Sequence, residues 1–104
     1  MSKRRVVITG LGIISAVGHR VEEAWDNVVN GRTGIAPITR FDASRFTTRF
    51  GGEIRDFEAS DYMSAKDARK VDAFIHYGIA ACKNAIEDAG LEVNEGNAHR
   101  TGIA

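Results

Sequence analysis

The first residues whose spacing could do chemistry are Gly10 and Gly12, which follow the apolar run Val6–Ile8. Two glycines after a strand can begin the G-x-G-x-x-G turn that holds the pyrophosphate of a dinucleotide. Here Ser15 stands at the third glycine position, and the next helical pattern begins too late for that motif. No clear second strand supplies the acidic residue that would bind the ribose. A tight turn therefore explains both glycines better, and a dinucleotide-binding dehydrogenase stays an alternative.

The side chains that most often act as nucleophiles or metal ligands are few. Cys82 is the only thiol, and it falls in mid-helix on an apolar stripe, without a helix N-terminus or an adjacent base to activate it. We interpret it as a buried small hydrophobe. His19, His76 and His99 are far apart and show no ligand spacing. The sequence predicts no metal or cofactor site.

Three basic residues are more suggestive: Lys66, Arg69 and Lys70 share one sector of a predicted helix near its N-terminal end. That sector lies opposite the apolar stripe and should face water. Positive charge does not stabilise a helix N-terminus, where the helix dipole is already positive. The cluster is either a solvated face balanced by Asp67 and Asp72 or a binding surface.

A second basic stretch covers residues 32–49, where one acid, Asp42, stands against four arginines: Arg32, Arg40, Arg45 and Arg49. Such a surface on a chain of zero net charge could attract a compact acidic partner.

Two helices are predicted to position these residues. Val21, Ala24, Trp25 and Val28 line one helical face, and Gly31 can end that helix in a left-handed conformation. The apolar spacing over residues 64–89 predicts a longer helix. Ser64 and Asp67 resemble a capping box at its start, and Gly90 ends it. Gly78 lies on its apolar side, where it would let another backbone approach closely.

Strands are predicted at Val6–Ile8, buried on both faces, and at residues 99–104, where another buried strand opens. Between the helices, a short strand is possible near Phe50–Arg55. The four phenylalanines of this region are interpreted as anchors that pin a long connection to the core: Phe41, Phe46, Phe50 and Phe57.

Composition excludes several classes of protein. The 104 residues carry 14 basic and 14 acidic side chains, which argues against a nucleic-acid binder dominated by phosphate contacts. No apolar run approaches the ~18–20 residues that span a bilayer, so no membrane partner is expected. One cysteine excludes an internal disulfide and suits a reducing cytoplasm. Hydrophobic residues at 43% are typical of a folded globular chain.

Taken together, the motifs resemble the β-ketoacyl-acyl-carrier-protein synthases, and among them the bacterial type II elongation enzymes. The resemblance covers essentially the whole chain and rests on the order of its motifs, which are Arg4–Gly12, Ser15–Gly18, Trp25, Gly31, Gly34–Ile35, Phe41–Asp42 and Arg69–Gly78. It implies an α/β chain that forms part of the thiolase-like α-β-α-β-α layered fold. Residues 1–104 would be the N-terminal part of its first half, without a complete second domain.

The resemblance also implies a function. In this family an acyl group passes from acyl carrier protein to a cysteine, and malonyl carrier protein then decarboxylates and attacks the thioester. The family's cysteine turn and active-site histidines have no match here, so no catalytic residue is expected in this chain. The resemblance implies that Lys66, Arg69 and Lys70 help dock acyl carrier protein, and that the full-length enzyme is a homodimer. A polyketide-type ketosynthase and a non-catalytic carrier-protein-binding homologue stay open.

Overall fold

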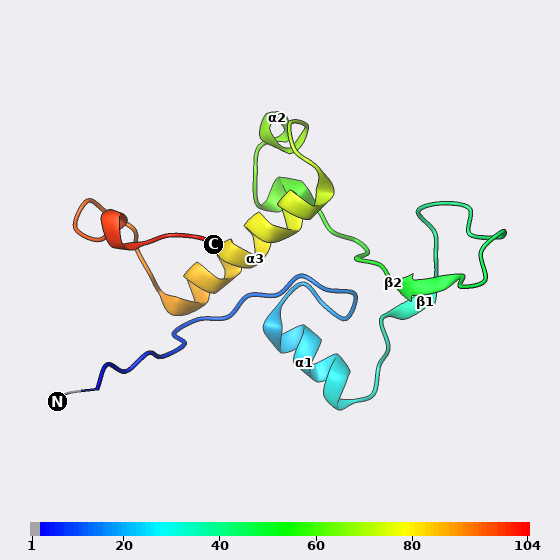
Figure 1. The fold of residues 1–104 in the computed structure, drawn as a ribbon, viewed down its shortest axis with the longest axis horizontal. Helices are drawn as coiled ribbons and strands as arrows, with labels where there is room; N and C mark the ends of the chain where they lie inside the picture. The colour runs from blue at the N-terminus through cyan, green and yellow to red at the C-terminus, as the bar shows by residue number, and fades with distance from the viewer. Residues whose placement is uncertain (1–2) are drawn as a thin grey trace.

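The structure is a computed structural model that describes residues 3–104. Its regular elements, in chain order, are α1 (Val21–Val29), β1 (Ile35–Pro37), β2 (Phe50–Gly52), the 3-10 turn η1 (Ala59–Asp61), α2 (Ala65–Ala68), α3 (Ala73–Ala89) and the 3-10 turn η2 (Ala98–Arg100). The long helix α3 lies at the centre, with the N-terminal segment running along it and the β1–β2 hairpin at the opposite end of the molecule (Figure 1).

Helix α1 confirms the first predicted helix. Glu22 and Glu23 occupy its first turn, where acidic side chains favour the positive end of the helix dipole. Gly31 follows it with a φ of 67°, the left-handed conformation that glycine adopts most easily. Of the predicted apolar face, Ala24 is buried, whereas Trp25 and Val28 are more than half exposed.

The single helix predicted over residues 64–89 is wrong, because the chain forms two helices there. Ser64 does cap α2, since its Oγ accepts a hydrogen bond from the Asp67 amide at 3.1 Å. The helix breaks before Asp72, whose backbone is extended (φ −75°, ψ 164°) and which stands at the N-cap of α3. Aspartate is a favoured N-cap residue, so a second helix start competes with continuation. Gly90 ends α3 as predicted, with a φ of 64°.

The two predicted outer strands are also wrong. Val6–Ile8 runs without regular secondary structure and its side chains are exposed, Val6 at 95%. Residues 101–104 are irregular too, and Ile103 is 79% exposed. A strand needs a hydrogen-bonded neighbour, and no other segment of residues 3–104 pairs with either of these.

The sheet that does form is a two-stranded antiparallel hairpin, in which Ile35 pairs with Gly52 and Pro37 with Phe50. Strand β2 confirms the strand predicted near Phe50–Arg55 in a shorter form. Only one of the predicted phenylalanine anchors is an anchor: Phe57 stacks on Tyr62 with ring centroids 5.7 Å apart and meets Tyr77 edge-on at 5.1 Å. The other three, Phe41, Phe46 and Phe50, are more than half exposed.

Close backbone packing occurs at different glycines from the one predicted. Among residues 3–104, a Cβ added to Gly78 would meet nothing within 4 Å, so the close approach expected there is wrong. A Cβ on Gly10 would lie 2.4 Å from the Ala85 carbonyl oxygen, and one on Gly12 would lie 2.0 Å from that of Ala81. The N-terminal segment therefore rests directly on the backbone of α3.

The arrangement is open. The radius of gyration is 17.5 Å, against about 13 Å for a compact domain of 100 residues. Among the described residues the buried apolar side chains are three alanines, Ala24, Ala43 and Ala80. The apolar faces of α1 and α3 are consequently only partly covered within this part of the chain. No helix in residues 3–104 has the length and hydropathy needed to cross a membrane.

Candidate functional site

The predicted binding residues lie together on α2 and the turn after it. Lys66 is on α2, Arg69 caps its C-terminal end and Lys70 follows, and all three are exposed; we call them the basic turn. Lys70 Nζ lies 4.0 Å from Asp67 Oδ1, and these side chains are 62% and 66% exposed. Such an ion pair contributes little to stability. Within residues 3–104, the side chains of Lys66 and Arg69 make no hydrogen bond or ion pair.

Tyr62 attaches the N-terminal side of the basic turn to α3. Its carbonyl accepts a hydrogen bond from Lys83 Nζ, and its hydroxyl accepts one from Asn84 Nδ2 at 3.3 Å. Phe57 covers its ring by stacking. Both polar contacts come from α3, so the chain entering α2 is held against that helix.

The C-terminal side of the basic turn is attached by His76. Its Nε2 lies 2.8 Å from the carbonyl oxygen of Ala68, the last residue of α2. A carbonyl oxygen only accepts hydrogen bonds, so Nε2 carries the hydrogen. The spacing of the histidines in the sequence does not indicate this role of His76. The available signal was Asp72, because a helix start there puts the first turn of α3 beside the end of α2.

Acidic side chains limit the extent of the positive surface. Residues 58–72 hold three basic and four acidic side chains, so positive charge is confined to the basic turn itself. Two of the carboxylates have local partners: Glu58 accepts hydrogen bonds from Ser60, and Asp67 accepts one from the Ser64 hydroxyl. A partner would therefore meet a small cationic feature, not a broad basic face.

The second basic stretch does not form a surface of free cations. Arg32 pairs with Asp26 at 2.8 Å. The Arg40 guanidinium donates to the Ile54 carbonyl and to the Tyr77 hydroxyl, each at 2.8 Å. Arg49 Nε donates to the Phe46 carbonyl at 3.1 Å. Three of the four arginines thus hold the chain's own backbone or side chains in position.

The thiol and the histidines are not assembled into a catalytic group. Cys82 is half-buried on α3 beside an open apolar hollow of about 550 Å³. His19 meets Phe57 edge-on at 5.8 Å, and His99 lies in η2. In the part of the chain from residue 3 to 104, no three His, Cys, Asp or Glu side chains converge closely enough to hold a metal ion.

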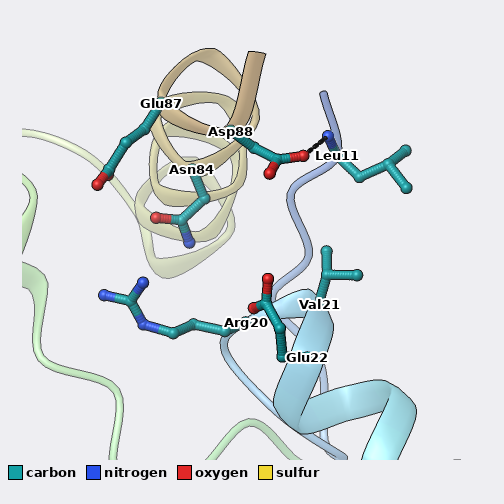
Figure 2. Close-up of a pocket in the computed structure, with 7 residues that line it drawn as sticks. All are labelled: Leu11, Arg20, Val21, Glu22, Asn84, Glu87 and Asp88. Atoms are coloured by element: carbon teal, nitrogen blue, oxygen red, sulfur yellow. Dashed lines mark hydrogen bonds between the residues drawn. The ribbon is translucent and has the colours of Figure 1, made fainter. Parts of the chain in front are cut away.

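The glycine turn faces a polar cleft of about 280 Å³ between the N-terminal segment, the start of α1 and α3 (Figure 2). Asp88 Oδ2 accepts a hydrogen bond from the Leu11 amide at 2.9 Å. Glu22 and Glu87 also line the cleft. A phosphate cradle needs free amides and positive charge. Here the Asp88 carboxylate occupies the amide between the two glycines, and the cleft holds one cation, Arg20, against three carboxylates, which disfavours dinucleotide binding.

Comparison with known proteins identifies the family. The family model described as "Beta-ketoacyl synthase, N-terminal domain" matches residues 3–104. The chain belongs to the beta-ketoacyl synthase family. It is 55% identical to 3-oxoacyl-[acyl-carrier-protein] synthase 2 of Vibrio harveyi over 100% of this chain and 25% of that protein. It is 46% identical to the protein of the same name from Synechocystis sp., over 99% of this chain and 25% of that protein.

A solved structure is also similar to this chain. The structure called "The ishigamide ketosynthase/chain length factor" superimposes with a TM-score of 0.80 at 38% identity, over 88% of this chain and 23% of that chain. This likeness confirms the expected α/β class and the thiolase-like fold. The chain spans about a quarter of the length of the curated relatives it matches. Membership of this family replaces the dehydrogenase alternative.

Proposed function

We propose that the full-length protein containing this chain is a decarboxylating condensing enzyme of fatty-acid elongation. It would first transfer an acyl group from acyl carrier protein to an enzyme cysteine, which releases free carrier protein. It would then join that acyl group to malonyl-acyl carrier protein, which releases 3-oxoacyl carrier protein and carbon dioxide and frees the cysteine. The observation that carries this proposal is the match to synthases named 3-oxoacyl-[acyl-carrier-protein] synthase 2, at 40% to 56% identity along nearly all of the chain.

Residues 1–104 would then be the N-terminal part of the first thiolase-like half, and their role would be to build the framework and a docking surface. In this proposal Cys82, His19, His76 and His99 take no part in bond making. The apolar mid-helix setting of Cys82 and the contacts of His19 and His76 with Phe57 and Ala68 support that assignment. A cytoplasmic location and a homodimer stay predictions from the resemblance.

We propose further that the basic turn binds acidic acyl carrier protein. Lys66 and Arg69 support this role because they are exposed and have no partner among residues 3–104. Exposed cations of this kind mainly steer association, and salt screens them. The contact should therefore change the KM for carrier-bound substrates far more than it changes kcat.

The experiment uses the full-length enzyme with acyl-carrier protein and malonyl-carrier protein. We expect 3-oxoacyl carrier protein and carbon dioxide in equal amounts. Exposed ion pairs contribute about 0.2–1 kcal/mol each, so reversing both charges in Lys66→Glu/Arg69→Glu should raise KM by roughly tenfold at low salt. Arg4→Glu/Arg5→Glu, which reverses two exposed cations outside the basic turn, is the matched charge-reversal control. Absence of condensation would refute the enzyme, and an unchanged KM at low salt would refute the docking site.

A polyketide-type ketosynthase is the second candidate, because the solved relative is named a ketosynthase/chain length factor. The two candidates differ in partner, so carrier proteins from fatty-acid and polyketide systems should be compared in the same assay. Preference for the polyketide carrier would favour the second candidate. Carrier-protein binding without condensation would favour the non-catalytic homologue.

A further inference from the structure

Helix α2 is too short to hold the basic turn by itself. It has four residues, and isolated helices of that length are not stable in water. Its last carbonyl groups also have no partner inside the helix, as at every helix C-terminus. The geometry of Lys66 and Arg69 must therefore be set by contacts with the rest of the chain, and these contacts lie on the two sides of α2.

The contacts of Tyr62 and His76 hold opposite ends of α2. Tyr62 holds the chain before α2 through Lys83 and Asn84. His76 holds Ala68, which lies between Lys66 and Arg69. We propose that His76 is a positioning residue for docking of the acidic carrier protein, acting through its Nε2–H···O=C bond to Ala68. The proposal rests on the docking function assigned above to the basic turn.

The chemistry of this bond defines the useful variants. The neutral imidazole with hydrogen on Nε2 and the imidazolium both donate from that atom, so the ring's charge is not needed for positioning. Glutamine carries an amide N–H at a similar reach from the backbone and can replace the donor. Leucine has similar bulk without a donor, and asparagine is polar but one methylene too short to reach Ala68.

Loss of the bond should weaken docking without touching the chemical step. A loosened basic turn must be ordered again when the partner binds, and that ordering reduces affinity. A single hydrogen bond corresponds to a change of about threefold to tenfold in an equilibrium constant. The expected effect is an increase of that size in KM for acyl-carrier protein, with kcat unchanged.

The test compares His76→Leu, His76→Asn and His76→Gln in the full-length enzyme. Each is assayed with acyl-carrier protein and with an acyl thioester of N-acetylcysteamine, a small substrate that has no carrier protein to dock. We expect His76→Leu and His76→Asn to raise only the KM for the carrier-bound substrate, and His76→Gln to restore it. If His76→Leu fails to fold, His76→Asn against His76→Gln carries the comparison.

The outcomes separate this inference from the function on which it rests. If Lys66→Glu/Arg69→Glu raises KM while His76→Leu and His76→Asn leave it unchanged, the positioning role is refuted and the docking site stands. If the charge reversal has no effect, the docking site itself is refuted. Equal losses on both substrates, or failure of His76→Gln to restore KM, would mean that His76 only stabilises the fold.

Discussion

Gly12 packs so closely against α3 that a larger residue at this position should destabilise the protein. A Cβ at this position would lie 2.0 Å from the Ala81 carbonyl oxygen and 2.8 Å from the Ala85 amide nitrogen. Real Cβ atoms essentially never come within 3.0 Å of such neighbours. Gly12→Ala must therefore push the N-terminal segment away from α3 by about 1 Å, because the helix backbone cannot yield locally.

The cost of that displacement has two parts. Overpacking of this kind costs about 1–3 kcal/mol. The same movement stretches the 2.9 Å hydrogen bond from the Leu11 amide to Asp88, worth about 1 kcal/mol at an exposed position. We expect Gly12→Ala to lower the free energy of unfolding of the full-length protein by about 3 kcal/mol.

Urea denaturation followed by circular dichroism measures this change, and hydrogen exchange of peptides covering Leu11 and Ala85 shows whether it is local. Gly78→Ala is the matched control, because its Cβ would meet no atom of residues 3–104 within 4 Å and alanine favours a helix interior by about 1 kcal/mol. A Gly12→Ala protein within about 0.5 kcal/mol of the wild type, with unchanged exchange at both peptides, would refute the packing described here.

Three further changes test local features. Hydrogen bonds from the Thr39 side chain and amide lower the pKa of Glu53 below its ordinary 4.5, so its contribution to stability is present above that pH and lost as the pH falls through the lowered value. Protection of the Thr39 amide should fall on acidification, and Glu53→Gln should abolish that pH dependence, as read by NMR. Gly90→Ala, at a φ of 64°, should cost about 1 kcal/mol in the same denaturation assay. Ser64→Ala should cost about 1 kcal/mol of α2 stability and raise the KM for carrier protein, while the KM for a carrier-free thioester stays constant.

Features that depend on neighbouring residues could be predicted from the sequence. The start of α2 at Ser64, the end of α3 at Gly90 and the turn at Gly31 each follow from the chemistry of one or two residues. The strands at Val6–Ile8 and 99–104 could not be predicted in this way. A strand exists through a hydrogen-bonded partner that is distant in sequence, and β-branched composition supplies no partner.

The glycines also show that contacts between residues distant in sequence are hard to predict. In the sequence, Gly78 interrupts an apolar helix face, and this position predicts close packing of another backbone. Close packing in fact occurs at Gly10 and Gly12, whose positions on the partner segment looked like a simple turn. In a contact between a helix and another segment, the glycine that allows close approach can lie on either one. The sequence does not tell which of the two carries it.

The break before Asp72 changes how the candidate site works. On one continuous helix, Lys66, Arg69 and Lys70 would be held by the helix itself, and no other residue would be needed to align them. On a four-residue helix followed by a turn, their alignment depends on separate contacts at Tyr62 and His76. Variants of Tyr62 and His76 should then affect docking as charge reversals do, but they leave the charges of Lys66, Arg69 and Lys70 unchanged. Salt dependence separates the two effects. Charge reversal should flatten the dependence of KM on ionic strength, whereas loss of the His76 bond should raise KM and leave the positive charge to be screened as before.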